Sequence, residues 1–346
     1  MTVFDAPDYR DHEQVVFVSD AATDLKAIIA IHNTHRGPAL GGCRFWAYAS
    51  EEEAIADALR LSRSMTYKSA LARLPLGGGK CVVIGDAATV KTPELLRALG
   101  RAIEQLHGRY VTAEDVGVTP EDLRIVREIT PHVAGLPETS GDPSPMTARG
   151  VFVGLALAAE RRLGAETLDG VKVAIQGLGA VGRALAEQLH AAGAKLIVAD
   201  IRPDAVQRAV VELNAEAVTT DEIFTAKADV FAPCALGAIL NDRTIHALKA
   251  AVVAGSANNQ LARAFHGEEL KKHNILYAPD YAINAGGIIN IAHENRETGA
   301  YDAVAAAAAV DGVADTLAEI FDRAEADNLP TSAVADTIAE ERLNEA

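Results

Sequence analysis

Two lysines twelve positions apart, Lys68 and Lys80, are the residues whose type and spacing first suggest chemistry in this chain. Lys80 ends the glycine run 77–79, and glycines permit tight turns and the close approach of a ligand to the backbone. An amine at the edge of such a turn is partly desolvated, which makes it a usable base near neutral pH. The alternative is a tight turn followed by a solvated lysine. The segment is not a phosphate-binding P-loop, because Cys81 stands where that motif requires Ser or Thr.

A carboxylate joins these amines at Asp115, within the segment 110–117. We expect a strand to end there and to deliver Asp115 into a loop. Taken alone, an aspartate in this setting is more often a turn residue than a catalyst. Together with the two lysines it forms a set of charges that shift one another's pKa values, and such sets are enriched at active sites.

A glycine-rich turn in the second half of the chain predicts a dinucleotide site. The apolar run 171–176 leads into Gly177, Gly179 and Gly182, and a helical pattern follows. These glycines allow a pyrophosphate to approach the helix N-terminus, whose unpaired N–H groups favour an anion. A turn of the same shape that binds nothing is the alternative, which the complete strand–turn–helix context disfavours.

The acid at the end of the next strand bears on which dinucleotide binds. Asp200 lies 18 residues after Gly182, where it is suited to bind both hydroxyls of the adenosine ribose and to repel a 2′-phosphate. We therefore expect NAD as the cofactor, whereas Arg202 nearby keeps NADP open. FAD is disfavoured, because its fingerprint usually opens a chain.

Three later loops are candidates for ligand contacts. Cys234 with Ala235, Asn258 and Asn284 lie in loops that each follow a predicted strand. In an open α/β sheet the carboxyl ends of the strands border the ligand crevice, where such residues could hold the nicotinamide amide and the substrate. Ordinary turn chemistry is the alternative. A nicotinamide cofactor, two lysines and an aspartate together suit the oxidation of an amino acid.

The elements that must position these residues divide the chain into two α/β parts. In the first part, Ser50, Thr92 and Thr119 mark helix starts, and 81–84 is a short buried strand. Beyond a helix at 147–162, apolar runs alternate with helical segments, which predicts a parallel sheet with helices on both faces. The runs are 171–176, 196–200, 229–232, 251–254 and 275–278.

The turn formers of 135–146 mark the crossing between the two parts. We assign residues 1–138 to an N-terminal domain and 139–329 to a nucleotide-binding domain. The stretch 303–325 and the tail beyond Pro330 are predicted helices. The last helix, about 330–346, is expected to pack back on the first domain.

Composition excludes several functional classes. At 346 residues the chain is long enough for two domains. A net charge of −16 argues against nucleic acid or an anionic membrane as partner, so we expect a small-molecule substrate. There is no signal-peptide pattern and no apolar run of membrane-spanning length. Three widely spaced cysteines fit reduced thiols in the cytoplasm, and no Cys or His spacing predicts a metal site.

Eight motifs, in order, resemble those of the Glu/Leu/Phe/Val amino-acid dehydrogenases, and most closely the leucine-specific members. The resemblance runs from about residue 12 to 343, and the motifs lie at 37–42, 65–68, 76–80, 112–117, 177–182, 232–237, 255–260 and 278–287. It implies an N-terminal mixed α/β catalytic and oligomerisation domain, a doubly wound Rossmann domain, and an active site in the cleft between them. It also implies a homo-oligomer, from dimer to octamer.

The resemblance assigns roles to the charged residues. The position matching Lys68 binds the substrate α-carboxylate. The position matching Lys80 is the base that activates the water attacking the imino intermediate, and the position matching Asp115 moves protons to and from the amino group. Further substrate contacts are implied at Gly41, Met65 and Asn258. The implied cofactor contacts are Thr147, Gly177, Leu178, Gly179, Ala180, Val181, Gly182, Asp200, Ile201, Cys234, Ala235, Asn258 and Asn284.

The same resemblance places the substrate side chain against Leu40, Ala113, Ile288 and Ile291, which are all aliphatic. A glutamate carboxylate would be buried there without a partner, which is costly. Phenylalanine-specific members tend to have smaller residues at the first two positions. One methylene discriminates by only about 1–3 kcal/mol, so broad specificity among leucine, isoleucine and valine is expected. A departure from the pattern is Asp142, where leucine-specific members have asparagine.

The sequence thus predicts a reversible, NAD-dependent oxidative deaminase of branched-chain L-amino acids that yields the 2-oxo acid, ammonium and NADH. An aromatic amino-acid dehydrogenase of the same family is the alternative. A non-catalytic NAD-binding sensor would need none of the three charged residues. A lyase with tightly held NAD is a further class.

Overall fold

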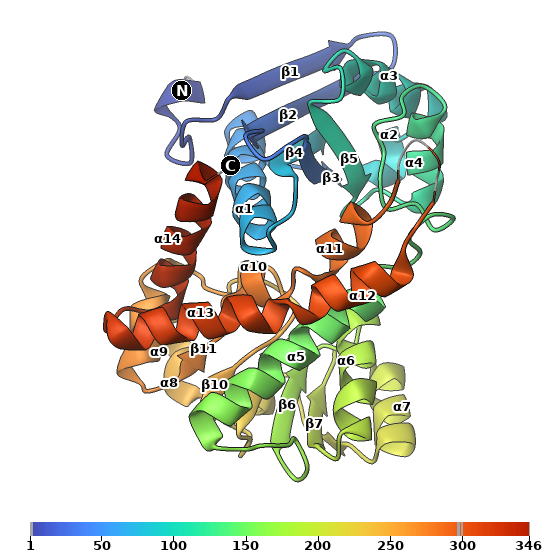
Figure 1. Ribbon diagram of the computed structural model, residues 1–346. Coiled ribbons are helices and arrows are strands. Elements are labelled where there is room, and N and C mark those ends of the chain that lie inside the picture. Colours follow the sequence, from blue (N-terminus) through green and yellow to red (C-terminus); the bar gives the residue numbers. More distant parts are fainter. Residues whose placement is uncertain (1–2, 296–297, 299, 346) are drawn as a thin grey trace. The chain divides into compact units, whose positions relative to one another are not determined.

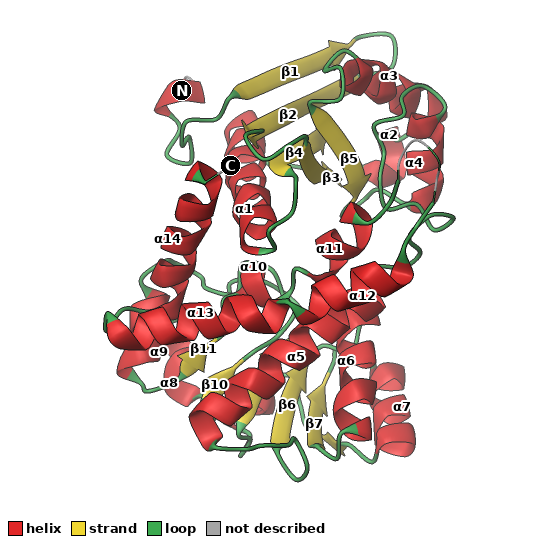
Figure 2. Ribbon diagram, viewed as in Figure 1, coloured by secondary structure: helices red, strands yellow, loops and turns green. Residues whose placement is uncertain are grey.

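The computed structural model describes residues 3–295, 298 and 300–345, and its strands form two sheets. The chain divides into two units. The first comprises Met1–Asp142, Ile291–Ala303 and Ala339–Ala346, and the second comprises Pro143–Asn290 and Val304–Ile338. Figure 1 follows the chain through both units, and Figure 2 separates helices from strands. No described helix is both long and apolar enough to cross a membrane.

The first unit is built on a mixed five-stranded sheet with the order β1-β2-β4-β3-β5. Strands β1, β2 and β4 are antiparallel neighbours, whereas β3 runs parallel to both β4 and β5. The strands are β1 Gln14–Asp20, β2 Leu25–Asn33, β3 Ala39–Trp46, β4 Gly77–Ile84 and β5 Tyr110–Glu114. The helices are η1 Val3–Asp5, α1 Glu51–Leu71, α2 Ala87–Val90, α3 Pro93–Glu104 and α4 Pro120–Arg127.

Helices cover both faces of this sheet. Ala54 and Ala58 of α1 pack with Ile28 and Val82 on one face. On the other face, buried residues of α3 and α4 join a larger cluster with β2, β3 and β4. Alternation along the strands directs successive side chains into the two clusters.

The three predicted helix starts are confirmed. Ser50 accepts a hydrogen bond from the backbone N–H of Glu53, and Thr92 accepts one from Leu95. Thr119 forms a complete capping box with Asp122. Each side-chain oxygen satisfies an N–H group that the first helical turn leaves unpaired.

The prediction of a tight turn at 77–79 is wrong, because these glycines begin strand β4. Their φ angles are not positive. Packing is what excludes a side chain there: a Cβ on Gly78 would lie 2.0 Å from the backbone nitrogen of Thr66 in α1. A Cβ on Gly79 would lie 2.7 Å from the ring of Tyr110. The run therefore lets α1 and Tyr110 approach the strand.

The second unit is built on a parallel six-stranded sheet with the order β11-β10-β9-β6-β7-β8, as predicted for a doubly wound α/β domain. The short strand β8 was not predicted. The strands are β6 Lys172–Gln176, β7 Lys195–Ala199, β8 Glu216–Ala217, β9 Val230–Pro233, β10 Val252–Val253 and β11 Leu276–Tyr277. Phe224, Ile245 and Leu270 pack on one face with Phe231 of β9.

The helices of this unit and of the C-terminal region follow most of the predicted pattern. They are α5 Ser144–Leu163, α6 Ala180–Ala191, α7 Pro203–Leu213, η2 Glu222–Thr225, α8 Asp242–Ala247, α9 His266–Lys272, α10 Asp280–Ile283, α11 Gly286–Ala292, α12 Ala303–Asp311, α13 Val313–Ala326 and α14 Thr331–Asn344. The single helix predicted at 303–325 is two helices, which meet at Gly312. Near the end of α14, Glu340 accepts a hydrogen bond of 2.5 Å from Tyr67 of α1.

One buried histidine gives the first unit a specific acid sensitivity. His32 is buried in β2, and its Nδ1 lies 2.9 Å from Oγ1 of Thr66. Burial lowers the pKa of His32 from 6.5 to about 4, and the neighbouring His12 acts in the same direction. The folded protein therefore holds this ring neutral, whereas the unfolded chain protonates it below pH 6.5.

We expect the free energy of unfolding to fall by about 2 kcal/mol between pH 7.5 and pH 5 through His32 alone. The stability is present above the unfolded pKa and is lost as the pH falls towards the folded pKa. Urea denaturation at the two pH values measures it. His32→Gln should remove this part of the pH dependence, whereas His35→Gln, at an exposed position, should retain it. An undiminished pH dependence in His32→Gln would contradict the assignment.

Candidate functional site

Strands β4 and β5, which flank β3, bring Lys80 and Asp115 into contact. Lys80 lies within β4 and is only 5% exposed. Strand β5 ends at Glu114, so that Asp115 follows directly, as predicted. The ammonium Nζ of Lys80 donates to Oδ2 of Asp115. A buried cation and its carboxylate thus lie side by side without an intervening side chain.

The environment of Asp115 keeps it ionised. Burial alone would raise the pKa of Asp115, but the ammonium of Lys80 and the guanidinium of Arg44 outweigh that effect and hold it below its usual value. The backbone N–H of Val116 also donates to Oδ1, at 2.8 Å. Both carboxylate oxygens therefore have partners that favour the charged form.

Glycines in β3 leave the room for this pair. A Cβ on Gly42 would lie 2.7 Å from Cβ of Asp115 and 3.3 Å from Nζ of Lys80. A Cβ on Gly41 would lie 1.7 Å from the carbonyl oxygen of Gly79 in β4. The hydroxyl of Tyr110 donates to the carbonyl of Gly41 at 2.7 Å, which fixes this part of β3.

The predicted substrate contacts of the first unit lie on the same elements. Lys68 and Met65 are half-buried residues of α1, three positions apart, and they therefore share a helix face. Leu40 on β3 and Ala113 on β5 are buried. Apart from Ile291, the predicted residues of this unit thus lie on α1, β3, β4 and β5, or directly after β5 in the case of Asp115.

The other predicted side-chain contacts lie on α11. Ile288 is buried, and Ile291, one turn further, is half-buried. The Cδ1 atom of Ile291 would lie 3.1 Å from a Cβ placed on Gly135. Asp142 also belongs to the first unit. Burial of Glu114 raises the pKa of that residue, and the carboxylate of Asp142 raises it further.

The glycine turn between β6 and α6 has the form predicted for dinucleotide binding. Gly177 has φ +98°, which only glycine adopts readily, and Gly179 is the N-cap residue of α6. A Cβ on Gly182 would lie 2.1 Å from the carbonyl oxygen of Gly177, so this glycine is required by helix–strand packing. A Cβ on Gly179 would meet no atom within 4 Å. The empty space beside Gly179, at the N-terminus of α6, fits an approaching phosphate.

Asp200 follows β7 and is tied to the same turn. Its Oδ2 accepts the backbone N–H of Leu178 at 2.6 Å, and its Oδ1 accepts that of Arg202 at 2.8 Å. Burial opposes its ionisation, but these hydrogen bonds and the guanidinium of Arg202 keep the pKa of Asp200 low. Nη2 of Arg202 donates to the carbonyl of Leu178 at 2.9 Å. Ile201, between the two charged residues, is 88% exposed.

The ends of neighbouring strands meet this turn. A Cβ on Gly177 would lie 2.8 Å from Cβ of Ala235 and 2.9 Å from the carbonyl oxygen of Cys234, in the loop after β9. Ala180 and Val181 form the first turn of α6. From β6 the chain adds β7 and β8 on one side and then β9, β10 and β11 on the other, so the strand order reverses between β6 and β9. Doubly wound sheets bind ligands at such a point.

The two predicted asparagines are in direct contact. Nδ2 of Asn284 donates to Oδ1 of Asn258 at 2.8 Å and to the carbonyl of Ser256 at 3.1 Å. Asn284 is the C-cap residue of the short helix α10, which lies between strand β11 and this loop. Oδ1 of Asn284 is buried and has no hydrogen-bond partner among the described residues. On α5, Oγ1 of Thr147 donates to the carbonyl of Pro143 at 3.0 Å.

Sequence reasoning missed Arg44, whose Nε lies 3.4 Å from Oδ2 of Asp115. The alternation of strand residues was the available signal, because positions 42 and 44 share one face of β3.

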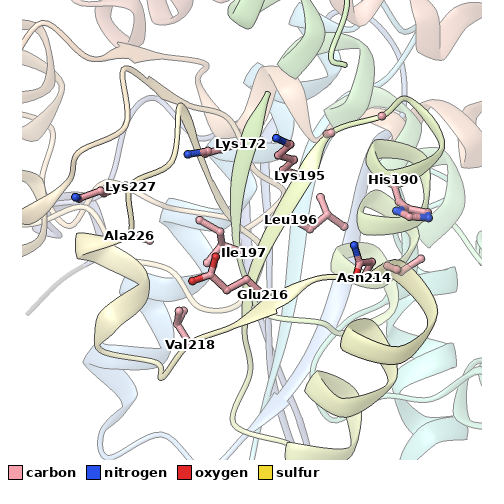
Figure 3. A pocket seen from close by; sticks show the side chains of 13 residues that line it. Lys172, His190, Lys195, Leu196, Ile197, Asn214, Glu216, Val218, Ala226 and Lys227 are labelled. Atoms are coloured by element: carbon pink, nitrogen blue, oxygen red, sulfur yellow. The ribbon is translucent and has the colours of Figure 1, made fainter. Parts of the chain in front are cut away.

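A hollow of about 720 Å³ is lined by none of the predicted residues. Figure 3 shows it with Lys172 and Lys195, which begin β6 and β7 at the end of the sheet opposite the glycine turn. No cluster of potential metal ligands occurs among the described residues.

The different surroundings of two glycines allow a test of the dinucleotide site. Gly179→Val should leave the Tm almost unchanged but raise the Kd for NADH at least about tenfold, because it fills the space open to the phosphates. Gly182→Val should lower the Tm, since overpacking of this kind costs about 1–3 kcal/mol or more. NADH fluorescence titration and thermal unfolding measure the two effects. Unchanged NADH affinity in Gly179→Val would refute this placement.

Comparison with known proteins agrees with the two-unit architecture. Residues 12–132 match the family model of the Glu/Leu/Phe/Val dehydrogenase dimerisation domain. Residues 140–203 and 198–324 match the Glutamate/Leucine/Phenylalanine/Valine dehydrogenase model. Together these matches span most of the chain.

Individual relatives cover nearly the whole chain. Leucine dehydrogenase of Thermoactinomyces intermedius is 52% identical over 350 residues, which is 99% of this chain and 94% of the relative. Phenylalanine dehydrogenase of Caldalkalibacillus thermarum is 46% identical over 341 residues, 96% of this chain and 91% of the relative. The crystal structure of L-tryptophan dehydrogenase from Nostoc punctiforme superposes with a TM-score of 0.85 at 44% identity, covering 97% of this chain and 96% of the other. The chain belongs to the Glu/Leu/Phe/Val dehydrogenase family and is an amino-acid dehydrogenase, an oxidoreductase that acts on CH–NH2 donors.

Proposed function

We propose that this dehydrogenase catalyses the reversible oxidative deamination of branched-chain L-amino acids with NAD. The observation that carries the proposal is the buried contact between Lys80 and Asp115. An amine and a carboxylate in contact can exchange a proton, and a water-poor environment strengthens their interaction with a charged substrate.

The roles proposed for the charged residues are those that the family resemblance implies, and their chemistry is compatible with them. Lys68 binds the substrate α-carboxylate as a cationic partner. Asp115, held ionised, accepts a proton from the substrate ammonium group, which leaves the neutral amine that oxidation requires. After oxidation, Lys80 in its amine form takes a proton from water, which then attacks the imino carbon. Asp115 returns a proton to the nitrogen of the tetrahedral adduct. The C–N bond then breaks as the carbonyl forms, and the departing ammonia takes up the hydroxyl proton and leaves as ammonium.

The residues around the glycine turn fit a bound dinucleotide. The open space beside Gly179 and the N-terminus of α6 would receive the pyrophosphate, and Asp200 would accept hydrogen bonds from the ribose. When bound, the nicotinamide ring supplies the two-electron acceptor that no side chain provides. NAD is proposed over NADP because a 2′-phosphate would approach the ionised Asp200. Asn284, whose buried Oδ1 lacks a described partner, could accept a hydrogen bond from the carboxamide.

The aliphatic character of the predicted pocket supports branched-chain substrates. Leu40 and Ala113 are buried residues of the first unit, so a charged substrate side chain beside them would lose its hydration without gaining a partner. The phenylalanine dehydrogenase at 46% identity makes an aromatic amino acid the second candidate. The leucine dehydrogenase at 52% identity supports the first.

We also propose a cytoplasmic homo-oligomer that acts on a small molecule without nucleic acid or membrane partners. The matched dimerisation-domain model covers residues 12–132, which contain all of β1. Strand β1 is an edge strand of its sheet, and its Phe17 is 55% exposed. Exposed strand edges are natural sites for pairing with another chain.

The first test is NADH formation at mildly alkaline pH with a panel of L-amino acids. Turnover should be fastest with leucine, isoleucine and valine, and faster with NAD than with NADP. Faster turnover with phenylalanine or tryptophan would preserve the mechanism and refute the pocket assignment. Absence of turnover with every amino acid would refute the proposed function.

The roles of the two lysines should separate in steady-state kinetics. Lys80→Ala should lower kcat by about 10³-fold, because it removes the base, and should leave NADH binding intact. Lys68→Ala should chiefly raise the KM for the amino acid, by roughly 10- to 100-fold, since a charge-assisted hydrogen bond is lost.

A matched control is Lys91→Ala. Lys91 also pairs with an aspartate of the first unit, Asp122, at 2.6 Å, but lies outside the predicted site. It should retain kcat and KM. Retention of near-parental kcat by Lys80→Ala would show that another group is the base.

A further inference from the structure

Arg44 bridges two carboxylates in the first unit. Its Nη1 lies 2.9 Å from Oδ2 of Asp57 on α1, and its Nε lies 3.4 Å from Oδ2 of Asp115. Nε is buried and makes no hydrogen bond among the described residues. The guanidinium therefore acts on Asp115 through its charge, whereas a directional hydrogen bond anchors it to Asp57.

Asp57 is a rigid anchor for this guanidinium. The hydroxyl of Tyr48 donates to its Oδ2 at 2.7 Å, and Nη2 of Arg60 donates to its Oδ1 at 2.9 Å. Burial opposes the charge of Asp57, but these donors and Arg44 hold the pKa of Asp57 below its usual value. An ionised and fully bonded Asp57 leaves Arg44 little freedom to move.

The backbone holds Arg44 next to the catalytic pair. The N–H of Phe45, the following residue, donates to the carbonyl of Val116 at 2.8 Å. The N–H of Val116 in turn donates to the carboxylate of Asp115. Arg44 and Asp115 are thus each one residue away from the same backbone hydrogen bond, which fixes their separation.

The proposed reaction creates a need for a second cation. When Lys80 acts as a base it carries no charge, and Asp115 then loses its nearest compensating charge. A guanidinium stays charged throughout, because Asp115 and Asp57 outweigh the effect of burial and raise the pKa of Arg44 further. Arg44 is therefore the permanent positive charge beside Asp115.

We propose that Arg44, fixed by Asp57, is a positioning residue that keeps Asp115 ionised and correctly oriented while Lys80 is neutral. This inference rests on the proposed function. It adds a residue that acts on the reaction through Asp115 and has no contact of its own with the substrate.

The test compares Arg44→Ala with Arg44→Lys and with the control variant Arg101→Ala. Arg44→Ala should lower kcat by about 10²-fold, the size of effect that a displaced catalytic group produces, with a much smaller change in the KM for the amino acid. Millimolar guanidinium chloride should restore part of the lost kcat, because it returns the charge to the vacated space. Arg44→Lys should lie between, since one ammonium cannot bridge both carboxylates.

Arg101 serves as the control because it also pairs with an aspartate of the first unit, Asp20, at 3.3 Å, with 55% of its side chain exposed and no part in the Asp57 anchor. Arg101→Ala should keep the parental kcat. An infrared or NMR titration of the Asp115 carboxyl should show a higher pKa in Arg44→Ala than in the parent. If Arg44 had a purely structural role, Arg44→Ala would have a lower Tm, and guanidinium chloride would not restore its kcat.

The outcomes separate this inference from the function on which it rests. A parent enzyme that turns over no amino acid overturns both. An active parent whose Arg44→Ala variant retains kcat, or loses kcat without rescue and without a shift of the Asp115 titration, overturns the role of Arg44 alone. Loss of kcat with rescue and with the titration shift supports it.

Discussion

The contact between Lys80 and Asp115 is the constraint on which the first unit depends. Two charges can be buried together only if their partners are close and their remaining hydrogen bonds are made. The structure meets this condition by placing β3 between β4 and β5, so that both charged residues flank one strand. Gly42 then leaves the space in which they meet.

The same constraint explains why glycines are concentrated in these strands. Glycine in a strand interior is unfavourable by itself, because it provides no side chain to pack and loses more conformational freedom on folding. Here Gly78 permits contact with α1, and Gly79 accommodates the ring of Tyr110. This loss of packing and of conformational freedom is offset, because the glycines let the helix that bears Lys68 pack against the strand that bears Lys80.

Much of the architecture was predictable, because it depends on local chemistry. The hydroxyl caps at Ser50, Thr92 and Thr119 act within one helical turn, and the glycine turn after β6 belongs to a compact strand–turn–helix unit. The misassignment of 77–79 has a different cause. A glycine run predicts a turn unless one knows which side chains pack against it. Here that side chain is Tyr110, which lies more than thirty positions later in the sequence.

The candidate site shows the same division. The lysines and Asp115 were found by residue type, whereas Arg44 was not, because its importance depends on Asp57 from α1 and on Asp115 from the end of β5. Likewise, the contact between Asn258 and Asn284 joins loops 26 residues apart. Such contacts between distant segments depend on tertiary packing, which the hydrophobic periodicity of a single sequence does not specify.

The hydrogen bonds of Asp200 have an evolutionary consequence. Its carboxylate holds the N–H of Leu178 and that of Arg202, while the side chain of Arg202 holds the carbonyl of Leu178. The residue proposed to bind the ribose is therefore also a structural member of the turn that precedes α6. Replacing it to admit a different nucleotide would loosen that turn at the same time. A lineage that changes its coenzyme would have to pass through compensating changes around residue 178, so single substitutions at residue 200 would rarely suffice for such a change.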